Sequence, residues 1–145
     1  QGHTQTGQSV TQGGVTFDTA AMQTIHEVAT EGLWADCDGG VVWRDLVAHV
    51  VPMGFVPPVL TNNLGVSIAG TTSVAGLGVA SYRYGTQADS AIELTVVTGT
   101  GEIVVCSREE NRPRALRSIA VRHHHSGEDQ AAPLQAEGAD VPPPL

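Results

Sequence analysis

The fold is decided by the stretch AIELTVVTGTGEIVVC, which spans residues 91–106. Its first half is an apolar run, and its centre, Thr98-Gly99-Thr100-Gly101, has the composition of a tight turn. A second run, rich in β-branched residues, follows at residues 103–106. Two such runs joined by a glycine-containing turn predict an antiparallel hairpin, with strands over residues 91–98 and 103–106.

One helix is expected upstream of this hairpin. Val42, Leu46 and Val50 recur at intervals of four residues, which is the spacing of one helix face. Pro52 and the glycine two residues later end the pattern. The predicted helix therefore covers residues 42–51.

The other upstream segments are expected to be strands and turns. Alternating polarity predicts a strand at residues 33–38 and a short strand around Val15 and Phe17. Residues 20–28 read as a weak helical or extended connection, and residues 60–85 suit strands and tight turns. Together with the hairpin, these segments predict an α+β fold: a mainly antiparallel sheet with one or two helices.

Composition excludes several classes of partner. The chain has 145 residues and a formal net charge of −8, and all seven basic residues are arginine. An acidic chain without a basic cluster does not suit nucleic acid or anionic membranes, and no apolar run approaches the length of a transmembrane helix.

No metal site is expected either. Cys37 and Cys106 lack metal-ligand spacing, and the run His123–His125 has no carboxylate or cysteine partners beside it. Asp36 and Asp38 alternate on the predicted strand and are expected to form a solvated face.

The character of the sequence changes after Ser107. The stretch from Arg108 to Leu145 holds five of the seven arginines and shows no apolar periodicity. We expect a domain over residues 1–107 and a disordered or out-of-frame tail over residues 108–145. The chain starts at Gln1 without a recognisable leader, so no compartment follows from it, although the cytoplasm is favoured.

Two small-residue segments are candidates for ligand binding. Gly2-His3-Thr4 is a loop with one histidine, and residues 67–76, SIAGTTSVAG, combine glycines with hydroxyl side chains. Small residues allow backbone N–H groups to approach a ligand closely, which suits a pyrophosphate or the edge of a flavin ring. Taken singly, each segment is more often an ordinary turn.

Seven stretches follow one another in a recognisable order: Gly2-His3-Thr4, Gly7-Gln8, Gln12-Gly13-Gly14-Val15, Trp43, Ala69-Gly70-Thr71-Thr72-Ser73, Arg83-Tyr84-Gly85-Thr86-Gln87 and Thr98-Gly99-Thr100-Gly101-Glu102. In this order they resemble the FAD-binding (PCMH-type) domain of the vanillyl-alcohol oxidase and p-cresol methylhydroxylase superfamily, and within it the cytokinin dehydrogenase-like proteins. The resemblance runs from Gln1 to about Asn111.

The resemblance implies FAD as the cofactor, held covalently. His3 falls where the family joins a histidine to the 8α carbon of the flavin. A covalent link keeps the cofactor bound and raises its reduction potential, which favours taking hydride from a substrate. The other implied FAD-binding positions, which contact the flavin or shape the backbone around it, are Thr4, Gln8, Ser67, Gly70, Thr71, Ser73, Gly76 and Leu77.

Asn62 is the implied active-site position. It stands where cytokinin dehydrogenases carry an aspartate that takes a proton from the substrate amine. An asparagine side chain is neutral and cannot act as a base. The resemblance therefore places Asn62 near a small-molecule substrate and leaves open which substrate that is.

The resemblance also predicts what the chain lacks. The family has a βαβ subdomain before the glycine-rich loop and a substrate domain after residue 111, and neither is matched here. We expect a partial FAD-binding domain of a flavin-dependent oxidoreductase, in which hydride passes to the flavin and then to oxygen or another acceptor. The alternatives are a non-catalytic or inactive flavin-binding fragment, and a sugar or alcohol oxidase of the same superfamily.

Overall fold

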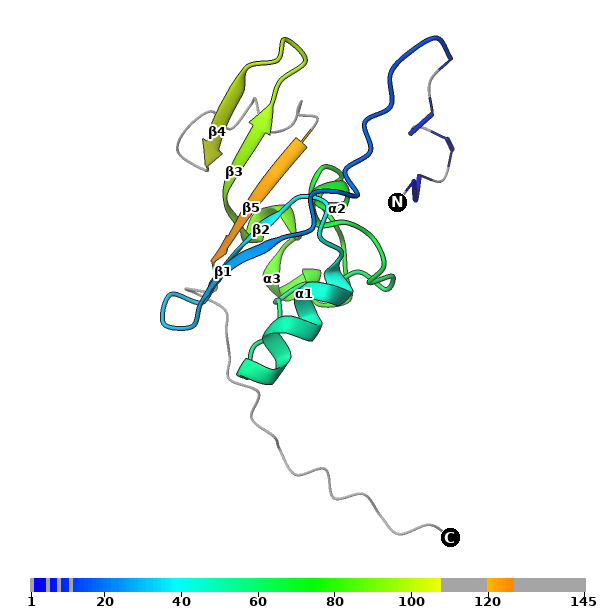
Figure 1. Ribbon diagram of the computed structural model, residues 1–145. Helices are drawn as coiled ribbons and strands as arrows, with labels where there is room; N and C mark the ends of the chain where they lie inside the picture. Colours follow the sequence, from blue (N-terminus) through cyan, green and yellow to red (C-terminus); the bar gives the residue numbers. More distant parts are fainter. Residues whose placement is uncertain (1, 5, 8, 11, 108–119, 127–145) are drawn as a thin grey trace, which may run out of the picture.

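The computed structural model describes residues 2–4, 6–7, 9–10, 12–107 and 120–126. Within them, five strands form one antiparallel sheet in the order β1-β2-β5-β3-β4 (Figure 1). The strands are β1 Ile25–Ala29, β2 Trp34–Asp38, β3 Ala91–Val97, β4 Ile103–Ser107 and β5 Ala120–Ser126. The helices are α1 Trp43–Val50, α2 Ile68–Thr72 and α3 Ser81–Tyr84, with 3-10 helices η1 Val51–Met53 and η2 Ala88–Ser90. The α+β prediction is confirmed.

The hairpin that decides the fold forms as predicted. Strands β3 and β4 pair antiparallel, with Val97 opposite Ile103 at the closed end. Across the turn, the N–H of Thr98 donates to the carbonyl of Glu102 at 2.8 Å, and the N–H of Gly101 donates to that of Thr98 at 2.9 Å. Gly101 has a φ of 83°, a left-handed conformation that a glycine adopts without strain.

Strand β5 joins this hairpin to the β1–β2 hairpin. It pairs antiparallel with β2 on one side and with β3 on the other. This strand was not predicted, because the stretch of residues 108–145 shows no apolar periodicity and was expected to be disordered or out of frame. The rest of that stretch lies outside the described residues, and the division of the chain at residue 107 stays a prediction.

The main core lies between α1, α2 and β2. The predicted helix is confirmed, and its apolar face is buried, with Trp43 only 1% exposed. This face packs with Ala35 and Cys37 of β2 and with Ile68 of α2. A second, smaller cluster joins Val96 of β3 to the apolar side chains of β4. Burying these faces is what fixes α1 and α2 to the sheet.

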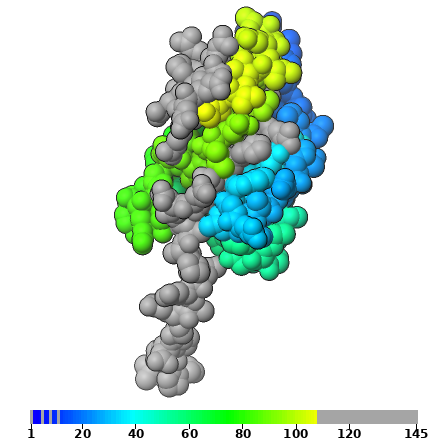
Figure 2. All heavy atoms as spheres, turned by 90° about the vertical axis from the view of Figure 1, so that its left-hand side faces the viewer, coloured from blue at the N-terminus to red at the C-terminus, as the bar shows by residue number. Residues whose placement is uncertain are grey.

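The space-filling view shows how these parts are distributed. The tip of the β3–β4 hairpin, in yellow, projects at one end of the molecule, while the β1–β2 hairpin and α1 occupy the other (Figure 2).

Several local expectations were wrong. Val15 and Phe17 are 76% and 66% exposed and lie in no strand, because alternation alone cannot form a strand without a pairing partner. Residues 60–85 were expected to form strands and tight turns, but they contain the one-turn helices α2 and α3. The expectation of a helical or extended connection at residues 20–28 agrees with strand β1, which begins at Ile25. Asp36 is buried, so the expected solvated face of β2 does not exist at this residue.

Candidate functional site

Helix α2 carries several of the predicted cofactor residues, and backbone bonds fix its first turn beside the end of β2. The N–H of Ile68 donates to the carbonyl of Val41 at 2.9 Å. The N–H of Ala69 donates to the carbonyl of Gly39 at 3.0 Å. A helix of five residues is too short to be stable by itself, so these bonds and the core beneath it hold α2 in place.

A buried hydrogen bond fixes α2 from the core side. The indole N–H of Trp43 donates to Thr71 Oγ1 at 2.8 Å, and both side chains are buried. The hydroxyl of Thr71 also lies 3.2 Å from the carbonyl oxygen of Ile68 and 3.3 Å from that of Ser67. The side chain of Thr71 therefore faces the interior, and this residue can face a ligand only through its backbone.

The other predicted residues of α2 lie at its outer side. Ser67 precedes the helix and is half-buried, and Gly70 is exposed. A Cβ atom on Gly70 would lie 2.9 Å from Ser67 Oγ, so glycine leaves that hydroxyl its room. Ser73 is exposed and donates its hydroxyl proton to the carbonyl of Ala69 at 2.7 Å, which leaves its oxygen available as an acceptor.

The chain leaves α2 through a left-handed turn, which we call the α2 exit turn, residues 73–78. Ala75 and Gly76 have φ values of 72° and 68°. The N–H groups of Gly76 and Leu77 donate to no acceptor within the described part of the chain, and Leu77 is 70% exposed. Unused donors in such a turn suit an anionic or carbonyl oxygen of a ligand.

His3 and Thr4 lie on a different segment, the N-terminal loop of residues 2–16. Both are exposed, and Figure 1 shows this segment, in dark blue, running away from the sheet. Thr4 Oγ1 lies 3.3 Å from Ser9 Oγ and accepts the N–H of Ser9 at 3.4 Å. Gln8, the third predicted residue of this loop, lies outside the described residues.

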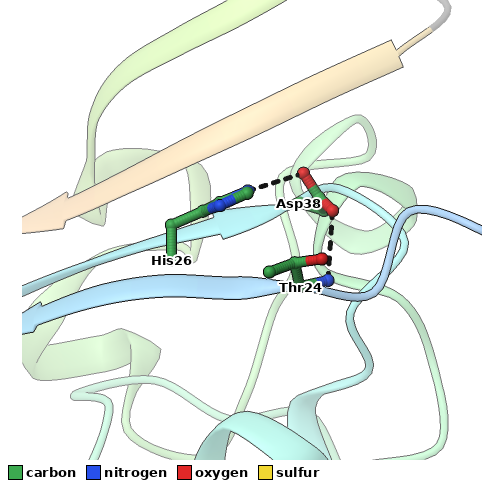
Figure 3. A network of polar contacts seen from close by, with 3 residues as sticks. All are labelled: Thr24, His26 and Asp38. Carbon is green, nitrogen blue, oxygen red and sulfur yellow. Dashed lines mark hydrogen bonds and ion pairs between the residues drawn. The ribbon is translucent and has the colours of Figure 1, made fainter.

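A polar network that sequence reasoning missed fixes the chain just after this loop. Asp38, at the end of β2, accepts the backbone N–H of Thr24 at 3.0 Å and contacts His26 Nε2 at 2.9 Å (Figure 3). The N–H of Asp38 donates back to the carbonyl of Thr24 at 2.9 Å. Because an ionised carboxylate only accepts hydrogen bonds, His26 Nε2 is the donor of this pair.

The network shifts the titration of Asp38. Partial burial raises the pKa of its carboxyl, while the hydrogen bonds from His26 and from the Thr24 backbone lower it, and the net pKa lies below the ordinary value. The ionised form of Asp38 is therefore the one that ties the start of β1 to the end of β2.

Asn62 is exposed in a loop that packs beside the α2 exit turn. The following residue shapes this loop, because Asn63 Oδ1 accepts the N–H of Gly65 at 2.8 Å. Two residues before Asn62, the carbonyl oxygen of Leu60 lies so close to Gly78 that a Cβ atom there would overlap it. The loop of Asn62 and the α2 exit turn are thus direct neighbours.

The structure therefore groups the predicted residues in two sets. Six of them follow one another along α2 and its exit turn: Ser67, Gly70, Thr71, Ser73, Gly76 and Leu77. The segment leading to Asn62 packs beside this set, while His3 and Thr4 belong to the exposed loop. Sequence reasoning also missed two buried polar side chains near the exit turn, Thr72 and Gln87. A signal for Gln87 was available, because Thr86 and Asp89 have the spacing of a helix-capping pair.

These residues fit a flavin nucleotide. The N–H groups of Gly76 and Leu77, which donate to no described residue, suit its polar oxygen and nitrogen atoms, and the exposed apolar side chains around them suit its ring. No group of three or more His, Cys, Asp or Glu side chains gathers as a metal site in the described ranges. No described helix is both long enough and apolar enough to cross a membrane.

Comparison with known proteins agrees with this fit. The model of a family described as FAD binding domain matches residues 1–107. An oxidoreductase of the fasciation locus of Rhodococcoides fascians is 41% identical over 110 residues, which are 76% of this chain and 25% of that protein. Cytokinin dehydrogenase 7 of Oryza sativa subsp. japonica is 36% identical over 115 residues, which are 77% of this chain and 22% of that protein.

Solved structures show the same likeness in three dimensions. The structure of 6-hydroxy-D-nicotine oxidase from Arthrobacter nicotinovorans superposes with a TM-score of 0.72 at 29% identity, covering 83% of this chain and 28% of that one. Chitooligosaccharide oxidase superposes with a TM-score of 0.63 at 23% identity, which shows a shared fold. The chain spans about a quarter of the length of these relatives. It belongs to the FAD-binding (PCMH-type) domain family of FAD-linked oxidoreductases.

Proposed function

We propose that this chain supplies the flavin-binding surface of an oxidoreductase that takes hydride from a small-molecule substrate. The observation that carries the proposal is the α2 exit turn, where the N–H groups of Gly76 and Leu77 donate to no acceptor among the described residues and Leu77 is exposed. This turn lies inside the region that matches the FAD-binding family. Bound FAD would accept the hydride in its ring system and pass the electrons to oxygen or another acceptor.

The residues of α2, of its N-cap and of its exit turn have different roles in binding FAD. The N–H groups of Gly76 and Leu77 donate to polar atoms of the cofactor, and the hydroxyl oxygens of Ser67 and Ser73 accept from it. Gly70 keeps the surface free of a side chain at the point of closest approach. Thr71 acts indirectly, because its side chain accepts a hydrogen bond from Trp43 that holds the backbone of the helix against the core.

The N-terminal loop supplies the covalent attachment. His3 is exposed, so its imidazole can reach the 8α carbon of the flavin without first leaving a buried environment. Thr4 and Gln8 add hydrogen bonds to the same end of the cofactor. The bond made by His3 raises the reduction potential of the flavin and so favours substrate oxidation.

Asn62 contacts the substrate. Its amide can donate and accept hydrogen bonds but cannot remove a proton at any pH at which the chain is folded. The substrate is therefore oriented by residue 62 and loses its proton to another group or to water. This favours an alcohol or an aldose over an amine whose oxidation depends on a carboxylate at this position.

Covalent flavin tests the central part of the proposal. The chain would be produced with added FAD, purified, precipitated with acid, and examined for flavin absorbance in the protein pellet. We expect the absorbance in the parent chain and its loss in His3→Ala. His49→Ala, at an exposed histidine of α1, is the matched control and should keep the absorbance. A colourless pellet from the parent chain contradicts covalent attachment.

A second candidate is a flavin-binding module without turnover of its own. The observation that favours it is Asn62, whose neutral amide cannot take a proton from a substrate. Flavin-loaded chain would be mixed in turn with alcohols, aldoses and N6-alkyl adenines under anaerobic conditions. Bleaching of the flavin by one substrate class identifies a catalytic chain, whereas none of the three bleaching it supports the binding module.

A further inference from the structure

Gln87 is a polar side chain placed in the interior by its neighbours. It is only 1% exposed. On either side of it, Asp89 Oδ2 accepts the N–H and the hydroxyl of Thr86, both at 2.8 Å, and the N–H of Asp89 donates to Thr86 Oγ1 at 3.2 Å. This exchange of hydrogen bonds brackets Gln87 and Ala88 at the start of η2 and so fixes the backbone from which the side chain of Gln87 enters the interior.

Gln87 connects two segments that belong to the proposed site. Its backbone N–H donates to the carbonyl of Gly76 at 3.0 Å, in the α2 exit turn. Its side-chain Nε2 donates to the carbonyl of Val59 at 3.3 Å, three residues before Asn62. Ala88 reinforces the first connection, since its N–H donates to the carbonyl of Ala75 at 3.0 Å.

The remaining polar atom of Gln87 is buried without a partner. Its Oε1 accepts no hydrogen bond from any described residue and lies against Gly76, where a Cβ atom would overlap it. An unpaired buried oxygen costs free energy, and an apolar side chain of similar size would avoid that cost. The unpaired oxygen of Gln87 lies at the contact between the exit turn and the segment before Asn62. We infer that the relative placement of these two segments is needed for ligand binding, at the expense of local stability.

We propose that Gln87 is a positioning residue that sets the distance between Asn62 and the backbone N–H groups of Gly76 and Leu77. This inference rests on the proposed function: if the exit turn binds flavin and Asn62 contacts the substrate, Gln87 sets the distance between substrate and flavin. It touches neither of them and acts through the carbonyls of Val59 and Gly76. The side chain of Gln87 does so by donating one hydrogen bond, which a glutamate can donate only when it is protonated.

Gln87→Glu therefore gives a pH-dependent test. Burial raises the pKa of a carboxyl group, so we expect a larger fraction of the new side chain to be protonated at pH 5 than at pH 8. The dissociation constant of FAD would be measured by flavin fluorescence at both pH values, with His3→Ala present in every chain compared so that binding stays reversible. We expect binding at least about tenfold weaker than in the parent chain at pH 8, and restored to within about threefold at pH 5. Gln87→Leu should bind weakly at both.

Gln23→Glu is the matched control, because it makes the same substitution at an exposed position. It should follow the parent chain at both pH values. An FAD affinity of Gln87→Glu equal to that of the parent chain at pH 8 would overturn the proposal. So would weak binding that does not recover at pH 5, because that pattern means general damage to the fold.

Hydrogen exchange without FAD separates this proposal from the proposed function. The N–H groups of Gln87 and Ala88 report whether the connection to the exit turn is closed. We expect their protection to fall in Gln87→Glu at pH 8 and to return at pH 5, after correction for intrinsic exchange rates. Unchanged protection at pH 8 overturns the positioning role. If protection falls and returns as expected but the parent chain binds no FAD, the flavin function is overturned instead.

Discussion

The α2 exit turn and the N-terminal loop both carry a left-handed glycine and both belong to the proposed flavin site, yet they are held in different ways. Gly76 in the turn has a φ of 68° and is packed against Gln87. Gly13 in the loop has a φ of 72° and nothing within 4 Å of its Cβ position. The difference shows that similar backbone conformations can have opposite origins, tertiary packing in one case and local sequence in the other.

This contrast gives the site one preformed side and one adaptable side. The exit turn is fixed by buried contacts from Trp43 through α2 and from Gln87 on the other side. The N-terminal loop makes hydrogen bonds such as those between Thr4 and Ser9, at the surface. A preformed surface reduces the entropy lost on binding, while an exposed loop can close over the ligand afterwards.

The largest effect is expected from Gly76→Ala compared with Gly13→Ala. At Gly76 an alanine has a strained backbone and a Cβ atom that overlaps Gln87, so we expect a loss of about 3 kcal/mol in the free energy of unfolding. At Gly13 the exposed loop can change its backbone, and we expect a loss of about 0.5 kcal/mol or less. Urea denaturation measures both. Equal losses would remove the distinction between the two regions.

An intermediate effect is expected where the core holds α2. Removing the indole N–H with Trp43→Phe should cost about 1–2 kcal/mol in the free energy of unfolding, because the bond to Thr71 is buried. Thr71→Val removes the other partner, and the double variant completes a thermodynamic cycle. We expect a coupling energy of about 1 kcal/mol between the two positions. A coupling of zero would mean that this bond does not stabilise α2.

The smallest effect is expected at Asp38, the last residue of β2, which fixes the chain just after the N-terminal loop. Its folded-state pKa is below the ordinary value, so its contribution to stability is full above about pH 4 and is lost as the pH falls through the folded pKa. Asp38→Asn should thus be less stable than the parent chain at pH 7, and the difference should shrink below about pH 4. Glu31→Gln, at an exposed position of the turn between β1 and β2, is the control for the change in net charge. A difference that stays constant down to about pH 2 would contradict the role given to the network.

The parts of the fold that were predictable are those with long, local patterns. The α1 face of Trp43, Leu46 and Val50 and the β3–β4 hairpin depend on periodicity and on a turn of suitable composition, both of which are visible in the sequence. Helix α2 was missed because its five residues owe their conformation to Val41, Gly39 and the core. Strand β5 was missed because its place in the sheet is created by the two hairpins on either side.

The candidate site divides in the same way. The segment from Ser67 to Leu77 could be predicted as a candidate site because its residues lie close together in the sequence and resemble a known family, and its role stays a prediction. Gln87 and Asp38 could not be assigned a role, because their partners lie 28 residues away at Val59 and 14 residues away at Thr24. Only the folded chain brings such residues together, and sequence spacing alone does not indicate these contacts.

The most direct test of the account is hydrogen exchange of the chain with and without FAD, followed at single amides. The account predicts that FAD slows exchange at the N–H groups of Gly76 and Leu77 and at the N-terminal loop, and leaves the β3–β4 turn, Thr98–Gly101, unchanged. Slower exchange in the loop together with unchanged exchange at Gly76 and Leu77 would contradict the claim that the α2 exit turn is the preformed flavin-binding surface.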